Sequence, residues 1–224
     1  GGITHEINQP LNAISISANS VLYWHRNNPG VLPKLFIEEL QQISKGAKRI
    51  DEIIRHMRSL WVADITTKME YNSPNQIIID SLSLIKQQLH AHGIIIEQKF
   101  TSQDISLFSD RVSLEQIIIN LLINAMHSLD ESDQTDKKII IQTRADKTSC
   151  ILSISDNGGG LPEGDEMVVF SPFYSTKDPS KSMGLGLAIV KNLVNKMDGS
   201  ISAVNNKPSG ARFIITLPIK DEIE

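Results

Sequence analysis

The sequence predicts two parts, an all-α helical hairpin over residues 1–66 and an α+β sandwich over residues 67–224. Apolar residues recur at alternating spacings of four and three as far as Trp61, the heptad pattern of helices packed in a bundle. After residue 65 helix-like and strand-like runs alternate instead. The stretch that follows Ser155 is rich in glycine, proline, serine and lysine and is expected to form a long loop.

The hairpin is predicted from two matching heptad seams. The first helix carries Ile7, Leu11, Ile14, Ala18, Val21 and His25. The second carries Phe36, Leu40, Ile43, Ala47, Ile50, Ile54, Met57 and Trp61, and the turn residues Asn27–Gly30 separate the two. Two helices leave most of each seam exposed to water, so a second copy that completes a four-helix bundle is expected, which predicts a homodimer. The alternative is that the hairpin packs on the C-terminal part of its own chain.

The C-terminal part is expected to place helices on one face of a mixed sheet. Helices are predicted near residues 74–90, 113–129 and 184–197. Strands are predicted near residues 93–100, 105–109, 138–144, 150–155, 199–205 and 211–218. The segment 63–71 is expected to be the hinge between the two parts.

Composition excludes several classes of protein. The 22 basic and 26 acidic residues give a net charge of -4, without the cluster of lysine and arginine that a nucleic-acid-binding protein needs. The single Cys150 cannot form an internal disulfide, which favours a cytoplasmic location. Apolar stretches fall short of the ~20 residues that cross a bilayer, so no membrane contact is expected. Because the chain opens inside a helix-like pattern at Gly1, any membrane anchor of the full-length protein is expected upstream.

Two asparagines lie within an apolar helical run. Asn120 and Asn124 are four residues apart and therefore share one helix face. A buried amide without a partner costs about 1–3 kcal/mol, so a ligand is one explanation, and a side-chain carbonyl is a suitable ligand for Mg²⁺. Capping or a hydrogen-bond network is the alternative.

Two glycine-rich motifs follow. In DNGGGLP, Asp156 closes a strand, and Gly158 and Gly160 allow the backbone to approach a ligand closely. A carboxylate there can accept a hydrogen bond from an exocyclic amine such as that of adenine, although ordinary Asn-Gly turns have the same sequence. In SMGLGLAIVKNLV, Gly184 and Gly186 open a helix whose free N–H groups favour a phosphate chain, but such starts also occur without phosphate.

Taken in order, these motifs resemble the N, G1 and G2 boxes of the GHKL (Bergerat) ATP-binding fold, which histidine kinases, DNA gyrase, Hsp90 and MutL share. The resemblance implies ATP and Mg²⁺ as cofactors, with Asn124 as the main metal ligand and Asn120 assisting. It implies that Asp156 contacts adenine and that His127 stands where the family often has a phosphate-contacting lysine or arginine. FSPFYSTK resembles the F box and lid of the kinase branch. The other nucleotide-binding positions implied are Gly158, Gly160, Phe173, Lys177, Gly184, Leu185, Gly186 and Leu187.

The N-terminal motif HEINQPL resembles the H box of histidine kinases, in the variant found in dicarboxylate sensors and haem-based oxygen sensors. His5 lies two residues before the seam residue Ile7, about 200° around the helix, so it is expected to face solvent. A neutral imidazole is a competent nucleophile near pH 7, and the resemblance assigns the neighbouring Glu6 to orient it and accept its proton. Many related kinases with phosphatase activity carry threonine or asparagine four residues after the histidine, whereas this chain has Gln9 there and Asn8 at three residues.

These features predict a sensor histidine kinase core that phosphorylates His5 from ATP. The resemblance implies that the phosphoryl group then passes to an aspartate of a response-regulator receiver domain. Two alternatives remain open. Another ATPase of the same fold would keep the asparagines and glycine boxes but lack HEINQPL ahead of a heptad hairpin. A degenerate kinase would use the hairpin only to dock a partner, although intact Asn124, Asp156 and Gly186 argue against it.

Overall fold

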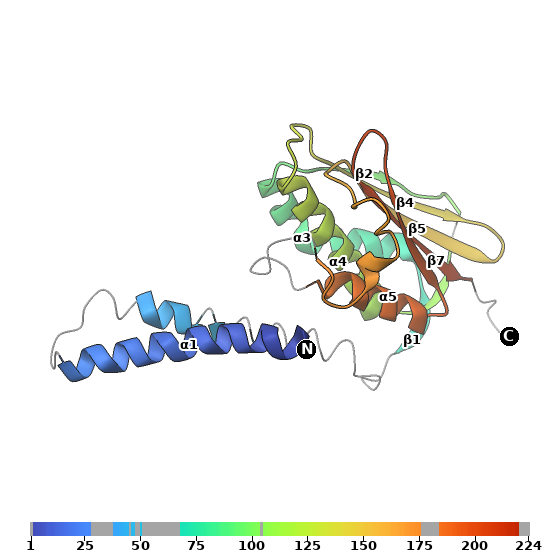
Figure 1. Cartoon of the computed structure of the whole chain (residues 1–224). Coiled ribbons are helices and arrows are strands. Elements are labelled where there is room, and N and C mark those ends of the chain that lie inside the picture. The colour runs from blue at the N-terminus through green and yellow to red at the C-terminus, as the bar shows by residue number, and fades with distance from the viewer. Residues whose placement is uncertain are drawn as a thin grey trace. The chain divides into compact units, whose positions relative to one another are not determined.

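A computed structural model describes the chain at residues 2–27, 38–44, 46–47, 50, 68–103, 105–175 and 184–219. It divides into two compact units. One consists of residues 1–62 with 179–183, and the other of residues 63–178 with 184–224 (Figure 1).

The described part of the first unit is a helical hairpin. Helix α1 spans Gly2–Asn27 and continues through Pro10. The second helix is described at residues 38–44, 46–47 and 50. Gly46 on this helix is buried, and a Cβ placed on it would lie 2.7 Å from Ile14 Cγ1 and 3.1 Å from the carbonyl oxygen of Pro10. The two helices therefore pack closely side by side, and glycine is the residue that permits it.

The contact between the two helices covers only part of the predicted seam. Ser17 is 6% exposed and Ile14 is half-buried, whereas Leu11 and Leu40 are 50% and 55% exposed in the single chain. Leu11 and Leu40 are thus left exposed by the two-helix hairpin, as predicted for a hairpin without its second copy. One neighbouring helix shields only one side of α1, so the rest of the seam stays in water. The seam residues Phe36, Ile54, Met57 and Trp61 lie outside the described residues.

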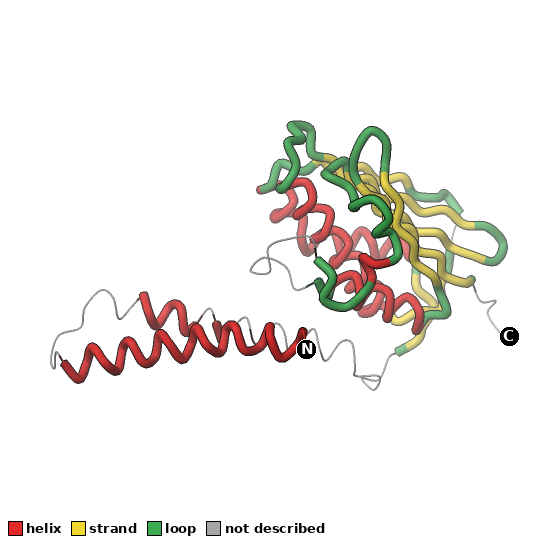
Figure 2. The backbone as a smooth tube through the Cα atoms, viewed as in Figure 1, coloured by secondary structure: helices red, strands yellow, loops and turns green. Residues whose placement is uncertain are grey.

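The second unit is built on a five-stranded mixed sheet with the order β2-β4-β5-β7-β6 (Figure 2). Strand β2 runs parallel to β4, and the other neighbouring pairs are antiparallel. The strands are β2 (Ile95–Lys99), β4 (Lys138–Ala145), β5 (Ser149–Asp156), β6 (Ser200–Asn205) and β7 (Ala211–Pro218). Residues on the inner face alternate with residues on the outer face, as the pleat requires. The predicted mixed sheet is confirmed.

Three helices cover one face of this sheet, as predicted: α3 (Pro74–Ala91), α4 (Arg111–Asp130) and α5 (Gly186–Lys196) (Figures 1 and 2). Helix α4 begins at the N-cap Asp110, whose carboxylate accepts a 2.9 Å hydrogen bond from the backbone N–H of Ser113. By length and composition alone α4 could span a membrane. It packs instead against α3, α5 and the sheet, where Ile117, Ile118 and Leu122 are completely buried. Helix α4 is thus the core helix of the unit.

The hinge prediction is partly wrong. Met69–Asn72 form strand β1, which pairs antiparallel with β3 (Leu107–Asp110) in a separate two-stranded sheet. The Asn72 amide donates a 2.9 Å hydrogen bond to the carbonyl of Ser109, and the rings of Tyr71 and Phe108 lie 5.2 Å apart. These partners are distant in sequence, so the local pattern did not indicate a strand. Residues 63–67 of the predicted hinge lie outside the described residues.

Replacing Ser81 by Ala is expected to stabilise the second unit by about 1 kcal/mol. Ser81 on α3 is 0% exposed, and its hydroxyl has no hydrogen-bond partner among the described residues. The control is Ser83→Ala on the same helix, where the exposed hydroxyl donates a 2.6 Å bond to the carbonyl of Asp80. Both changes give the same gain in helix propensity, so the difference between their free energies of urea unfolding contains only the buried Ser81 hydroxyl and the exposed Ser83 hydrogen bond. Destabilisation by Ser81→Ala would show that a bound water satisfies it.

Candidate nucleotide-binding site

The asparagine pair lies in the middle of α4, away from either cap. Asn120 and Asn124 are both partly buried, and Asn120 Nδ2 is buried without a hydrogen-bond partner among the described residues. A Cβ placed on Gly186 would lie 3.8 Å from Asn124 Nδ2 and 3.9 Å from its Oδ1. The amide of Asn124 therefore faces the first residue of α5. An unpaired buried amide beside it is costly unless a ligand completes the site.

The start of α5 is held by the segment that precedes it in the loop. Gly184 has a φ of 64°, and a Cβ there would lie 2.4 Å from the carbonyl oxygen of Tyr174. Only glycine fits this position without moving the backbone. Leu185 at the N-cap makes no side-chain hydrogen bond to the helix, so the first N–H groups of α5 have no cap from that residue. Such a helix start favours an anionic group.

Asp156 lies at the end of β5, in the turn predicted to contact a base. Its side chain is buried, at 5% exposure for the residue, and its Oδ1 accepts hydrogen bonds from Gly158 N at 2.8 Å and Ala211 N at 3.3 Å. These two backbone donors fix the carboxylate in orientation. A Cβ on Gly158 would lie 2.5 Å from Ser128 Oγ on α4. The glycine turn therefore packs directly against the last turns of the helix that carries the asparagine pair.

The loop between β5 and α5 is fixed at its beginning. The side chain of Asn205 holds the backbone of Leu161. The Leu161 N–H donates to Asn205 Oδ1 at 2.7 Å, and Asn205 Nδ2 donates to the Leu161 carbonyl at 2.9 Å. Gly160, just before it, has a φ of 81°, and a Cβ there would lie 2.8 Å from Asn205 Oδ1. The chain therefore leaves the Asp156 turn along a defined path.

The far end of the described loop is fixed as well. Phe173 adopts a left-handed φ of 65°, and its N–H donates a 3.0 Å hydrogen bond to the carbonyl of Gly184. The hydroxyl of Tyr174 donates to the Asp165 carboxylate, and this hydrogen bond raises the pKa of Tyr174. Phe170 is buried in an edge-to-face contact with Phe213. Both ends of the loop are therefore anchored to the domain.

The structure brings some of the predicted residues together. Asn120, Asn124 and Gly186 form one cluster, and Asp156 with Gly158 forms a second cluster against the same helix α4. Leu185 is buried, Leu187 is partly buried, and His127 lies in the last turn of α4. Lys177 lies outside the described residues. His5, Glu6, Asn8 and Gln9 are helical residues of α1 in the other unit, and their side chains lie outside the described part of the chain.

Three side chains that the motifs did not single out position the site. Ser128 contacts the glycine turn, Asn205 holds Leu161, and the Asn206 amide donates to Ser155 Oγ at 2.7 Å and to the carbonyls of Asp156 and Ala211. Asn205 is the last residue of β6, and Asn206 follows it just before a turn. Except for the bond from Asn206 to Ala211, their contacts bridge more than 40 residues of sequence, so the sequence position alone gives no sign of them.

The donor set fits Mg²⁺ bound with a nucleotide. Mg²⁺ usually keeps several waters and takes one or two protein oxygens together with substrate phosphates. The amide oxygen of Asn124 offers such a ligand, and the start of α5 offers N–H groups to phosphates. In the described part of the chain, no group of three or more histidine, cysteine, aspartate or glutamate residues could hold a metal ion. A cation bound here would therefore depend on the nucleotide for most of its ligands.

This fold and site define an ATP-binding module, a helix-covered mixed sheet with an asparagine pair opposite a glycine-led helix. The model of the histidine kinase-, DNA gyrase B- and HSP90-like ATPase family matches residues 109–221, and the chain belongs to that family. The predicted GHKL-type ATPase fold and the use of ATP are thereby confirmed.

The curated relatives are sensor proteins that match nearly the whole chain. Sensor histidine kinase TmoS of Ectopseudomonas mendocina is 26% identical, over 97% of this chain and 22% of the relative. C4-dicarboxylate transport sensor protein DctS of Rhodobacter capsulatus is 24% identical, over 98% of this chain and 33% of the relative. Sensor protein FixL of Bradyrhizobium diazoefficiens is 28% identical, over 98% of this chain and 43% of the relative. The chain thus spans less than half the length of these relatives. The predicted resemblance to a histidine kinase catalytic core is confirmed.

Solved structures give the same result. The catalytic domain of histidine kinase ThkA is 27% identical, with a TM-score of 0.58, and the match covers 67% of this chain and 99% of that one. Acinetobacter baumannii histidine kinase AdeS has a TM-score of 0.71 over 97% of this chain and 98% of that one. At 22% identity the second likeness shows the fold alone.

Proposed function

We propose that this chain is the catalytic core of a sensor histidine kinase, which uses Mg-ATP to phosphorylate His5 and then passes the phosphoryl group to a response regulator. The observation that carries the proposal is the placement of Asn124 opposite Gly186 in an ATPase domain that follows a helical hairpin bearing HEINQPL. A solved complex of the histidine kinase ThkA with the response regulator TrrA supports the choice of partner. For this chain the partner would be a receiver domain with an acceptor aspartate.

In this proposal the imidazole of His5 attacks the γ-phosphorus of ATP. A nitrogen–phosphorus bond forms, the bond to the β-γ bridging oxygen breaks, and ADP leaves. Glu6 orients the ring and accepts the displaced proton. Asn124, with Asn120, would hold Mg²⁺, and the ion would supply neutralisation of the phosphate charge. Asp156 recognises adenine, and Lys177 and His127 contact the phosphates. Asn8 and Gln9 are the candidate residues for a phosphatase reaction at His5.

We also propose that the hairpin forms a homodimer. Leu11 and Leu40 are half exposed in the single chain, together with Ile16 at 67% and Leu22 at 54%. Leu11 and Leu40 are seam positions, whereas Ile16 and Leu22 lie beside the seam, and exposed apolar side chains of this kind are what a second hairpin covers in a four-helix bundle. The proposed domains are a phosphotransfer hairpin over residues 1–66 and a catalytic domain over residues 67–224. Access to ATP places both in the cytoplasm.

The test is to incubate the purified chain with γ-labelled ATP and Mg²⁺. The proposal expects label on the protein that survives alkali and is lost in acid, as a phosphoramidate does, and that moves to an added receiver domain. Label that survives acid would identify a hydroxyl acceptor instead. If the protein binds ATP but never becomes labelled, also with additional residues before Gly1, the chain is a docking module without kinase activity.

Replacing Asn124 by Ala is expected to weaken Mg²⁺-dependent ATP binding by at least about 10-fold, because it removes the proposed metal ligand. The control is Asn195→Ala, which changes an exposed asparagine on α5 of the same domain. Titration of a fluorescent ATP analogue with and without Mg²⁺ gives the measurement. The change should be large only when Mg²⁺ is present. An equal loss without Mg²⁺ would mean that Asn124 supports the domain and does not bind the cation.

A further inference from the structure

A cavity of about 250 Å³ lies on the outer face of the sheet, the face that the helices leave uncovered. Its floor contains Ile140, Ser155 and Arg212, which are cross-strand neighbours on β4, β5 and β7. Ile139 and Ile141 are completely buried beneath the helices, so Ile140 between them points the opposite way. We call this space, lined also by residues 206–209 and by Lys138, Asp156 and Asn157, the outer-sheet cavity.

Positive charge dominates the outer-sheet cavity. Three cationic side chains line it, namely Lys138, Lys207 and Arg212. Neither Lys207 nor Arg212 forms an ion pair with any residue that the structure describes. Asp156 is the only carboxylate in the described lining, and its Oδ1 is already held by two backbone N–H groups. Two of the three cations thus lack an anion.

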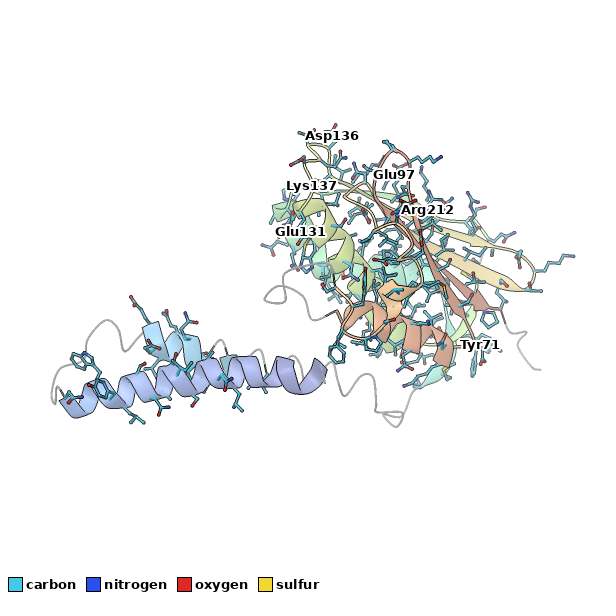
Figure 3. All side chains as sticks on the ribbon, viewed as in Figure 1. Tyr71, Glu97, Glu131, Asp136, Lys137 and Arg212 are labelled. Carbon is cyan, nitrogen blue, oxygen red and sulfur yellow. The ribbon has the colours of Figure 1, made fainter. Side chains whose placement is uncertain are left out.

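The neighbouring Glu97 does not neutralise these two cations. It lies on β2, in the same cross-strand row as Ile140, Ser155 and Arg212, but β4 and β5 separate β2 from β7. Figure 3 labels Glu97 and Arg212. The Glu97 carboxylate pairs with Lys138 and, at 2.9 Å, with Lys99. Hydrogen bonds from these two ammonium groups hold the pKa of Glu97 below its usual range. Glu97 therefore offsets charge on its own side of the cavity.

The floor of the outer-sheet cavity also contains the buried hydroxyl of Ser155, whose proton is available for a hydrogen bond. Ser155 is only 7% exposed, and its oxygen accepts a 2.7 Å hydrogen bond from Asn206 Nδ2. Within the described residues, no acceptor lies in hydrogen-bond reach of the Ser155 hydroxyl proton. A guanidinium, an ammonium and a hydroxyl proton that all face one small space form a donor-only set, which suits an oxygen-rich anion.

We propose that the outer-sheet cavity binds a small phosphate-bearing molecule, at a site that shares only Asp156 with the proposed nucleotide residues. Arg212 and Lys207 would bind the phosphate oxygens, with Ser155 donating to a third. A volume of about 250 Å³ is small for a nucleotide and suits a phosphate group with a short carbon chain. The proposed nucleotide residues Asn124 and Gly186 lie on the helix-covered face of the sheet. The proposal does not depend on kinase activity.

The test is a titration of the ¹⁵N-labelled chain with glycerol 3-phosphate, and separately with inorganic phosphate, at constant ionic strength, followed by amide NMR shifts. Saturable shifts are expected at Ser155, Asn206, Ser209 and Arg212. Arg212→Gln should weaken binding at least about 10-fold, because a hydrogen-bonded charge pair is lost. If only inorganic phosphate gives saturable shifts, the ligand is the free phosphate ion, and the anion site is still supported.

The matched control is Arg144→Gln, which removes an arginine from the same outer face of the sheet but outside the outer-sheet cavity. It should change the dissociation constant less than about 2-fold, since only screened long-range charge is lost. Lys207→Gln, in the surface loop, gives a second test if Arg212→Gln fails to fold. Linear shifts without saturation, equal weakening by the Arg144 and Arg212 changes, or shifts confined to residues 184–187 would each overturn the proposal.

Discussion

A His5→Gln variant is expected to lose labelling from γ-labelled ATP entirely, a fall of at least about 1000-fold, while it still binds ATP. Glutamine keeps a polar side chain of similar length on α1 but has no nucleophilic ring nitrogen. The ATP-binding residues lie in the other compact unit, so their folding does not depend on His5. Labelling is measured by acid-sensitive, alkali-stable radioactivity on the protein, and nucleotide affinity by a fluorescent ATP analogue.

The control for this prediction is His25→Gln, a second histidine of the same helix α1. It tests whether any loss of labelling comes from disturbing the hairpin, because His25 is one of the predicted seam positions. His25→Gln should retain most of the labelling. If His5→Gln is still labelled with an acid-sensitive group, another residue is the acceptor, and the H-box assignment is wrong even though the ATPase fold stands.

A Gly184→Ala variant is expected to lose about 3 kcal/mol of unfolding free energy and most of its nucleotide affinity. A left-handed φ costs an alanine about 1–2 kcal/mol. The new methyl group would also lie 2.4 Å from the carbonyl oxygen of Tyr174, so backbone must move, which typically costs a further 1–3 kcal/mol. The displaced segment carries the start of α5. Urea unfolding and nucleotide titration give the two measurements.

Gly164→Ala is the matched control for Gly184→Ala. Gly164 also has a left-handed φ, 85°, but a Cβ there would meet nothing within 4 Å. It should lose only about 1 kcal/mol, the cost of the backbone conformation alone, with nucleotide affinity unchanged. Equal losses in the two variants would show that the contact between Gly184 and Tyr174 contributes nothing and that conformational strain explains the whole effect.

Much of the fold could be predicted because its elements carry local periodic signals. Helix α4 combines a continuous apolar pattern with an N-cap aspartate, and the strands β4, β5 and β7 are bounded by polar turns. Strand β1 was missed because its four residues have no pattern of their own and are ordered by β3, more than 30 residues further along. Which helix covers each position of the α1 seam could not be predicted, since a heptad pattern marks every apolar position of a bundle and does not say which neighbour lies against it.

The site could be predicted only at positions where a motif contains a residue type with a specific chemical role. Asn124 and Gly186 come from motifs more than 60 residues apart, and the structure confirms that they face each other across α4 and α5. The supporting contacts of Ser128, Asn205 and Asn206 could not be predicted, because serine and asparagine side chains bond backbone in many different surroundings. The roles assigned to His5, Glu6 and Lys177 stay predictions.

The pairing of β1 with β3 fixes where the chain enters the ATPase domain. Met69 lies opposite Asp110, and Asp110 caps the first turn of α4. Main-chain pairing therefore connects the start of the domain to the N-terminus of α4. Asn120 lies about 14 Å further along the same helix. A displacement of the chain at residue 68 would therefore reach the first turn of α4, the central helix of the ATP site, before it reached the rest of the domain.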